Sequence, residues 1–329
     1  MADLSTTYMG IPLSSPVVVA ACSLSGKVDN IRHAEQAGAG ALVIKSLFEE
    51  QIQWEASNLE EAENVGAERF AESLTYFPPM EHAGSREHLM WVEKTRKVVT
   101  MPLLGSLNAI SRSNWVGYAR QLQDTGVDGL ELNVYGVQTD MYQTADDVEK
   151  SLYETVENVL AEVTIPVAVK LSPFYTSVVN IAGELDRRGA KGLVLFNRFL
   201  QPDIDMENET LRNSMTWSRP EEMRLPLRYI ALLYGRIKAD LAASSGVHTA
   251  EAVIKQLLAG ATIVQVASAL YLHNIDYIKT LNDGLAGWMD QKGYKKSADF
   301  RGKLSQRDVK DLFAFERAQY VDLLLKQKA

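Results

Sequence analysis

The sequence predicts an α/β fold in which eight parallel strands close into a (β/α)8 barrel, also called a TIM barrel. Eight short runs rich in valine, leucine and isoleucine alternate with segments of helical periodicity, which is typical of parallel strands joined by helical crossovers. Four of the runs follow similar glycine-containing turns, at 37–40, 125–129, 188–192 and 259–262. In such a barrel the chemistry lies at the C-terminal ends of the strands, so these ends are the first candidates for a site.

Length and charge limit the kinds of protein that this chain can be. With 329 residues, 46% of them hydrophobic, the chain can bury a large core, and α/β barrels of this length commonly form one domain. We therefore predict a single domain over residues 1–329. The net charge of -8, with lysine and arginine scattered, argues against binding to nucleic acid or to an anionic membrane.

The composition also predicts a cytoplasmic protein. Cys22 is the only cysteine, which excludes an intrachain disulfide and fits a reducing compartment. The first residues lack the basic segment and apolar core of a signal peptide. No apolar run approaches the ~18 residues that would indicate a membrane span.

The first half of the chain supplies four of the strands and a long insert. Apolar runs predict strands at 17–21, 41–45, 102–106 and one that ends at Asn133, and helical spacing predicts helices at 27–37, 86–98 and 112–125. Residues 48–85 interrupt the alternation and are rich in glutamate. This insert after the second strand is either a solvated helix with a loop or a segment that folds over the mouth of the barrel.

The second half repeats the pattern with a second insert. Strands are predicted at 166–170, 192–196, 239–243 and 262–266, and helices at 144–162, 177–188, 227–236, 249–258 and around 278–288. A polar insert at about 198–226 follows the sixth strand. The chain is expected to finish in a helical tail at about 298–329.

Polar and small residues stand at the C-terminal ends of the predicted strands and would converge on one mouth. They are Ala21, Cys22, Lys45, Ser46, Asn133, Lys170, Asn197, Ser245, Gly246, Ala267 and Ser268. A lysine at the inner end of a barrel strand is costly to bury without an anionic partner, so each lysine could form a structural salt bridge. Two lysines beside two asparagines favour a bound anion or an electron-rich ring instead.

The loops after the seventh and eighth strands indicate a phosphate site. Ser245-Gly-Val247 and Ala267-Ser268 occupy the positions at which this fold often binds phosphate, through backbone N–H groups and a helix N-terminus. Short loops of serine, glycine and alanine also occur as plain turns, so both interpretations stay open here.

With these residues in place, the chain resembles the dihydroorotate dehydrogenases, and most nearly their soluble class. The resemblance covers nearly the whole chain and depends on a set of shared motifs. These are Val43–Ser46, Glu131–Asn133, Ala168–Pro173, Phe196-Asn197, Leu258–Val266 and Lys292–Leu304. The first strand and its loop, Val19–Ser23, also resemble the flavin domain of dihydropyrimidine dehydrogenases.

The resemblance implies FMN as the cofactor, bound by residues at the strand ends. Cofactor contacts are implied for Ala21, Cys22, Lys45, Ser46, Asn133, Lys170, Ser245, Gly246, Val247, Ala267 and Ser268. Lys170 would lie near the N1/O2 edge of the flavin, where a cation stabilises the anionic reduced ring.

The resemblance also implies a small-molecule substrate, dihydroorotate or a similar cyclic compound. Substrate contacts are implied for Lys45, Asn133, Gln138, Asn197 and Arg198. In the family, a cysteine or serine three residues after Asn133 takes the C5 proton while hydride leaves C6 for the flavin. A hydride transfer of this kind would belong to pyrimidine biosynthesis.

The sequence departs from the family pattern at the position of the catalytic base. That position is Gly136, which has no side chain, and a positioned base contributes roughly 10²–10⁴ in rate. Gln138 stands in place of an asparagine and Arg198 in place of a serine. The phosphate loops are also altered, with Ser245 and Ala267 at positions where glycine is usual.

Several residues are candidates for compensating roles. Tyr135 could replace the base if a cation such as Lys45 or Arg198 made its phenol more acidic. Arg198 could pair with a substrate carboxylate or bridge to Asp203 or Asp205. His82 and His88, at or after the first insert, are expected at the surface.

The departures leave three functional hypotheses. The first is dihydroorotate dehydrogenation, the second is a diverged FMN oxidoreductase acting on another cyclic substrate, and the third is a non-catalytic flavoprotein. A homodimer is expected by analogy with the family. A separate electron-transfer subunit is possible on the same analogy, and the chain itself has no cysteine cluster for an iron–sulfur centre.

Overall fold

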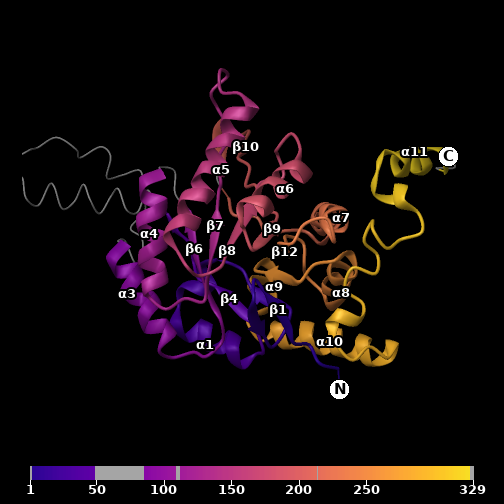
Figure 1. The fold of residues 1–329 in the computed structure, drawn as a ribbon, viewed down its shortest axis with the longest axis horizontal. Coiled ribbons are helices and arrows are strands. Elements are labelled where there is room, and N and C mark those ends of the chain that lie inside the picture. Colours follow the sequence, from indigo (N-terminus) through magenta and orange to yellow (C-terminus); the bar gives the residue numbers. More distant parts are fainter. Residues whose placement is uncertain (1, 49–84, 109–111, 213, 327–329) are drawn as a thin grey trace, which may run out of the picture.

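The computed structural model describes residues 2–48, 85–108, 112–212 and 214–326, and its centre is a closed barrel of eight parallel strands (Figure 1). The strands are β3 (Val17–Val19), β4 (Ala41–Val43), β6 (Leu103–Asn108), β7 (Gly129–Asn133), β8 (Val167–Leu171), β9 (Gly192–Leu195), β12 (Asp240–Ser244) and β13 (Ile263–Val266). β3 pairs with both β4 and β13, and a further pairing of β4 with β6 closes the circle. The short β5 (Leu47–Phe48) extends the sheet beside β6. The predicted fold class is confirmed.

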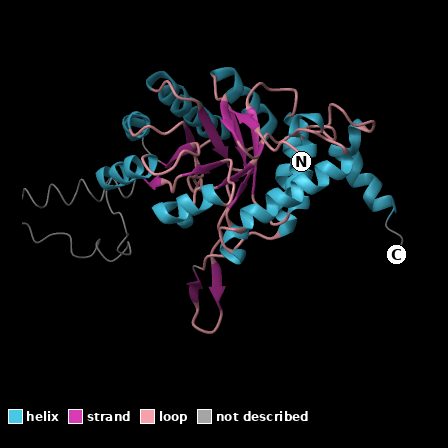
Figure 2. Cartoon of the chain, turned by 90° about the horizontal axis from the view of Figure 1, so that it is seen from below, coloured by secondary structure: helices cyan, strands magenta, loops and turns pink. Residues whose placement is uncertain are grey.

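Helices surround the strands, as a view from below shows (Figure 2). They are α1 (Val28–Gln36), α3 (Ser85–Arg96), α4 (Arg112–Asp124), α5 (Ala145–Glu162), α6 (Val178–Arg188), α7 (Arg224–Leu233), α8 (Ala250–Ala259), α9 (Ser268–His273) and α10 (Tyr277–Lys292). In α5, Leu152, Val156 and Val159 share one buried face, as their helical spacing predicts. Thr144 begins this helix by accepting a hydrogen bond from the Asp147 N–H.

The barrel interior has an apolar half that is closed by an N-terminal hairpin. β1 (Thr6–Tyr8) and β2 (Ile11–Leu13) form this antiparallel hairpin, which inserts Tyr8 among inward-facing side chains such as Val18 and Val194. A Cβ at Gly192 would lie 2.6 Å from the Tyr8 hydroxyl, so only glycine leaves room for the ring. The sequence interpretation missed this hairpin.

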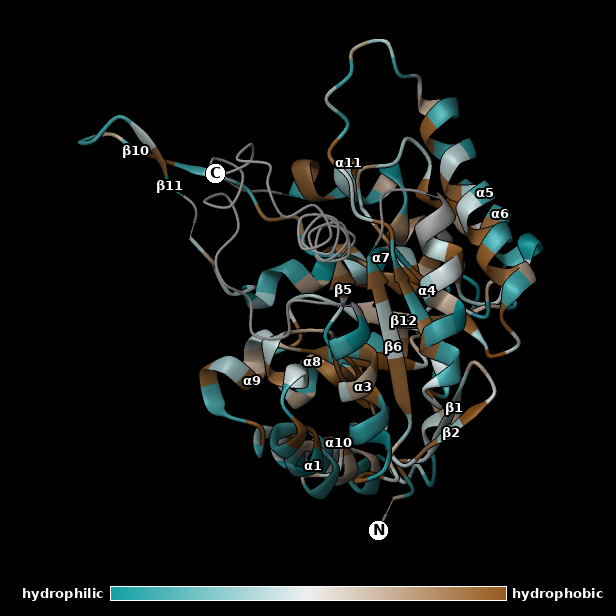
Figure 3. Cartoon of the chain, turned by 90° about the vertical axis from the view of Figure 1, so that its left-hand side faces the viewer, coloured by the Kyte–Doolittle hydropathy of each residue, from teal (hydrophilic) through white to brown (hydrophobic). Residues whose placement is uncertain are grey.

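The second predicted insert is more ordered than a polar loop. β10 (Asp203–Asp205) and β11 (Thr210–Arg212) pair as an antiparallel hairpin that projects from the body of the protein (Figure 3). α7 then begins at Arg224, three residues before the predicted helix. The first insert falls almost wholly on residues 49–84, outside the described part of the chain. Both alternatives for it, a solvated helix with a loop or a segment over the barrel mouth, therefore lie outside the described residues, as does His82.

The helical tail expected at about 298–329 is only partly helical. Short 3-10 helices at Ser297–Asp299 and Leu312–Phe315 flank a run of turns, and only α11 (Arg317–Lys326) is an α-helix. α11 lies at the periphery of the molecule (Figure 1), where Gln319 accepts a hydrogen bond from Arg228 of α7. Within the described ranges, no helix is both long and apolar enough to cross a membrane.

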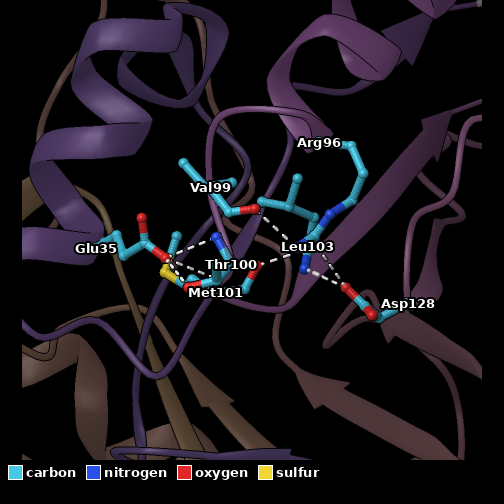
Figure 4. A network of polar contacts seen from close by, with 7 residues as sticks. All are labelled: Glu35, Arg96, Val99, Thr100, Met101, Leu103 and Asp128. Atoms are coloured by element: carbon cyan, nitrogen blue, oxygen red, sulfur yellow. Dashed lines mark hydrogen bonds and ion pairs between the residues drawn. The ribbon is translucent and has the colours of Figure 1, made fainter.

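A polar network fixes the loop that enters β6, at the end of the barrel opposite the strand C-termini (Figure 4). Glu35 of α1 accepts three hydrogen bonds of 2.7 Å, from the N–H and hydroxyl of Thr100 and the N–H of Met101. Arg96 of α3 donates to the Val99 and Met101 carbonyls and to Asp128. The network therefore joins α1 and α3 to the starts of two strands.

Candidate active site

A cavity of about 370 Å³ lies at the C-terminal ends of the barrel strands. It brings together every residue predicted from the strand ends, along with the predicted contacts Arg198 and Val247. They are Ala21, Cys22, Lys45, Ser46, Asn133, Lys170, Asn197, Arg198, Ser245, Gly246, Val247, Ala267 and Ser268. Its volume falls in the range of roughly 300–1,000 Å³ that is typical of small-molecule sites.

Strand alternation places a charged network at the floor of this cavity. In β7, Leu130 and Leu132 face the helices, so Glu131 faces the barrel interior. Lys170 of β8 donates to Glu131 Oε1 at 3.4 Å and to Gln265 Oε1 of β13 at 3.3 Å. The Gln265 amide nitrogen in turn donates to the other Glu131 oxygen. All three side chains are buried.

Amide and hydroxyl groups occupy the side of the cavity next to this network. Asn197 Nδ2 donates to Asn133 Oδ1 at 2.7 Å, so the two asparagines that end β7 and follow β9 form a pair. The hydroxyls of Ser46 and Ser106 are 2.7 Å apart. These two hydrogen bonds fix the orientation of the Asn133, Asn197 and Ser46 side chains that line the cavity.

Lys45 differs from Lys170 in its surroundings. Within the described ranges, Lys45 Nζ has no hydrogen-bond or ion-pair partner. Its backbone is held, because its carbonyl oxygen lies 3.0 Å from His88 Nε2. His88 is buried, so the expectation that it lies at the surface is wrong.

The loop after β12 adopts the left-handed backbone that its position requires. Ser245 has φ of 76° and Gly246 has φ of 70°. A Cβ at Gly246 would lie 2.2 Å from the Met223 backbone nitrogen, so this residue must be glycine. Ser245 holds a conformation that glycine adopts more easily, which agrees with glycine being usual at its position.

Side chains around this loop tie it to residues 216–218. Ser218 N–H donates to Ser268 Oγ at 3.0 Å, and the Ser218 hydroxyl lies 2.9 Å from His248 Nε2. Burial lowers the pKa of His248, which favours its neutral form. The Trp217 ring stacks on Tyr271 with centroids 4.3 Å apart, at the edge of the cavity.

Arg198 holds the same segment in place. Its Nε donates to Glu222 at 3.2 Å, and its other nitrogens donate to the Thr216 and Trp217 carbonyls. The expected alternative, a bridge to Asp203 or Asp205, is wrong, because the acidic partner is Glu222. Its predicted contact with a substrate carboxylate stays a prediction.

The loop after Asn133 lies beside the cavity, on a neighbouring hollow of about 660 Å³. Tyr135, Gly136 and Gln138 line this hollow, and the Tyr135 ring lies 5.8 Å from that of Phe199. A Cβ at Gly136 would meet only the end of the Gln138 side chain, at 3.3 Å. The predicted roles of Tyr135 and Gln138 stay predictions.

Sequence reasoning missed several residues that line or support the cavity. Glu131 and Gln265 had a detectable signal, because each is a polar residue at an inward position of an otherwise apolar strand. Trp217 and Tyr271 had none, because they lie 54 positions apart and meet only in the folded chain. Among the described residues, no group of histidine, cysteine, aspartate and glutamate could hold a metal ion.

Comparisons with known proteins match most of the chain to one family. A family model for dihydroorotate dehydrogenase matches residues 64–289, more than half of the chain. The catalytic subunit of dihydroorotate dehydrogenase B (NAD(+)) from Thermoplasma acidophilum is 24% identical, over 92% of this chain and 99% of its own length. A putative dihydroorotate dehydrogenase A (fumarate) from Aeropyrum pernix is also 24% identical, over 91% of this chain and 97% of its own.

Proposed function

The chain belongs to the dihydroorotate dehydrogenase family, and from this premise we propose that it is an FMN-dependent oxidoreductase of pyrimidine biosynthesis that oxidises dihydroorotate. The observation that supports this most strongly is the convergence of Lys45, Lys170, Asn133 and Asn197 on one cavity. Cations and amides in the same cavity suit a ligand that is both anionic and rich in hydrogen-bonding edges.

The residues of the cavity fit FMN. Ser245 and Gly246 line the cavity and both have positive φ, which gives a tight backbone turn of the kind that presents N–H groups to a phosphate. Lys170 supplies a buried cation for a ring that becomes anionic on reduction. When bound, FMN would supply the hydride acceptor.

The remaining steps belong to the chain's own side chains. The Asn133 and Asn197 amides would orient the substrate ring, and Lys45 would attract its carboxylate, since no described residue neutralises this lysine. Holding the reacting carbon in one orientation can lower the activation free energy by on the order of 7 kcal/mol in favourable cases.

The proton at C5 needs an acceptor on the loop after Asn133. Gly136 offers none, and Tyr135 is the candidate that the same loop provides. The Tyr135 N–H donates to the Asn133 carbonyl at 3.0 Å, which fixes this residue close to a proposed substrate contact. Tyr135 would act as general base from the neighbouring hollow once substrate fills the mouth of the barrel.

The assignment is tested by product formation. Purified protein supplied with dihydroorotate and a dye as electron acceptor should form orotate, and Lys45→Met should raise the KM for dihydroorotate while keeping its flavin. A protein that holds FMN and forms no orotate with any acceptor would contradict the assignment.

We also propose that the chain forms a homodimer, by analogy with the family. After the flavin has taken the hydride, a final acceptor would take the electrons from the flavin. The relatives are named both for NAD(+) and for fumarate, and those named for NAD(+) are described as catalytic subunits. Fumarate reduction by the purified chain would place it with the second group. Reduction of NAD(+) only after addition of an iron–sulfur partner subunit would place it with the first.

A further inference from the structure

We propose that Glu131 is a positioning residue that lowers the reduction potential of the bound flavin by neutralising Lys170. The inference rests on the proposed function only in requiring that FMN occupies the cavity. The Glu131 side chain does not line the cavity, and it lies beneath Lys170 in the barrel.

The geometry makes Glu131 the partner of Lys170 on the barrel floor. Glu131 is 1% exposed and Lys170 is 7% exposed, so water screens neither charge. Lys170 Nζ is 3.4 Å from Glu131 Oε1. Gln265 holds both groups, since it accepts from Lys170 and donates to Glu131.

No other described group offers Lys170 an anion. The Tyr8 hydroxyl is buried deeper in the barrel, and burial together with the charges of Glu131 and Asp240 raises its pKa well above the usual value. The phenol is therefore neutral. Asp240 is engaged elsewhere, because it accepts from the Met9 N–H and the Thr262 hydroxyl.

The electrostatic consequence follows from this pairing. A cation beside a flavin stabilises the reduced, anionic ring, and the effect is large where water is excluded. A carboxylate in contact with that cation cancels much of its field at the ring. Lys45, which has no partner among the described residues, keeps its full charge, so Glu131 reduces the contribution of one of the two lysines only.

Sulfite provides a probe of this field that does not depend on turnover. Sulfite forms a bond from its sulfur to flavin N5, the electron pair moves to the N1/O2 edge, and the adduct is anionic. A more positive surrounding therefore lowers the Kd for sulfite. The adduct is measured by loss of the visible flavin absorbance in a titration of the FMN-loaded protein.

Three variants separate charge compensation from a structural role. Glu131→Gln keeps the shape and removes the carboxylate charge, so sulfite should bind about tenfold more tightly, equivalent to a rise of about 30 mV in potential for a two-electron couple. Lys170→Gln should weaken sulfite binding by a similar factor or more. The double variant, in which both groups are neutral, should return to within about threefold of the native Kd. If the single variants acted only by damaging the structure, the double variant would instead bind sulfite more weakly than either of them.

Asp240→Asn is the matched control. It removes one negative charge from the same barrel, but Asp240 begins β12 and lies about 13 Å along the strand from Ser244, which lines the cavity. Its sulfite Kd should stay within about twofold of native. Should Glu131→Gln fail to hold FMN, Glu131→Asp takes its place, with a smaller shift in the same direction because the shorter carboxylate lies farther from Nζ.

The outcomes distinguish this inference from the proposed function. A native protein that cannot bind FMN would contradict the proposed function itself. A native protein that binds FMN while Glu131→Gln, or Glu131→Asp in its place, leaves the sulfite Kd unchanged would overturn the role of Glu131 alone. A double variant that binds sulfite more weakly than both single variants would also overturn the role of Glu131.

Discussion

Gly136 stands where related enzymes, by resemblance, place a cysteine or serine base. It is exposed and has no left-handed φ, and a Cβ there would meet only the flexible end of Gln138. A side chain can therefore be added without disturbing the loop. In a Tyr135→Phe background, which removes the proposed base, we expect Gly136→Cys to reduce the flavin with dihydroorotate about 10²-fold faster than Gly136→Ala, because a positioned base contributes at least that factor. Stopped-flow absorbance under anaerobic conditions measures both rates, and equal rates would show that the loop does not face the substrate.

Tyr135 is the second test at this scale. Tyr135→Phe keeps the ring that packs near Phe199 and removes only the hydroxyl. We expect flavin reduction by dihydroorotate to slow by about 10²-fold with the flavin content unchanged. The same stopped-flow experiment applies, with reduction by dithionite as the control for access to the flavin. A native rate in Tyr135→Phe would assign the base to another group.

Residue by residue, the sequence predicted the lining of the cavity better than its support. A residue at a strand end is placed by the barrel topology alone, so Lys45, Lys170, Asn133 and Asn197 could be found without coordinates. The partners of these side chains depend on register and rotamer. That Lys170 meets Glu131 and Gln265, and that Arg198 meets Glu222, required the folded chain.

At the scale of elements, the loop after β12 depends on two left-handed residues. Gly246→Ala should lose FMN affinity and cost on the order of 1–3 kcal/mol of unfolding free energy, from strain and from the clash with Met223. Ser245→Gly should relieve strain and stabilise the protein by about 1 kcal/mol. Thermal melts and FMN titrations measure both effects.

Gly287→Ala is the control for the loop variants. Gly287 lies in α10, is exposed, and a Cβ there would meet nothing within 4 Å. Alanine should stabilise this helix by up to about 1 kcal/mol without changing FMN affinity. If Gly246→Ala bound FMN as tightly as Gly287→Ala does, the loop could not be the phosphate site.

The network at Glu35 predicts how stability depends on pH. Burial alone would raise the pKa of Glu35, but hydrogen bonds from Thr100 and Met101 outweigh burial and lower the pKa. A lowered carboxyl pKa contributes stability that is present above the unfolded value of 4.5 and is lost as the pH falls below it. Because water screens this partly exposed carboxylate, Glu35→Gln should lower the free energy of unfolding by no more than about 1 kcal/mol at pH 7, and the stability of the variant should fall less steeply in acid. Urea melts at pH 7 and pH 4 test this, and parallel pH profiles would contradict it.

Elements with strong periodicity were predicted within a few residues, and short local hairpins were missed. The β1–β2 hairpin turns at Met9 and Gly10, both with positive φ, and its three-residue strands are too short for a clear alternation. The β10–β11 hairpin is exposed on nearly every residue, so no apolar pattern marks it. In the tail, helical spacing predicted a helix across residues that form turns between the two short 3-10 helices.

At the scale of the whole molecule, the barrel explains why one chain can gather distant residues into one site. The cavity draws its lining from positions spread between Ala20 and Tyr271, where several strand ends and loops contribute one or a few residues each. Closure of the barrel by β4 and β6 fixes these contributions relative to one another. That the whole chain forms one domain, and that two chains form a dimer, remain predictions.

The central claim, that this barrel binds FMN and oxidises dihydroorotate, is tested most directly by a visible spectrum of the purified protein before and after anaerobic addition of dihydroorotate. The account predicts flavin absorbance that bleaches when dihydroorotate is added and returns when an electron acceptor follows. Flavin absorbance that persists in excess dihydroorotate, and bleaches only with dithionite, would contradict the proposed substrate. A colourless protein that takes up no added FMN would contradict the assignment of the cavity itself.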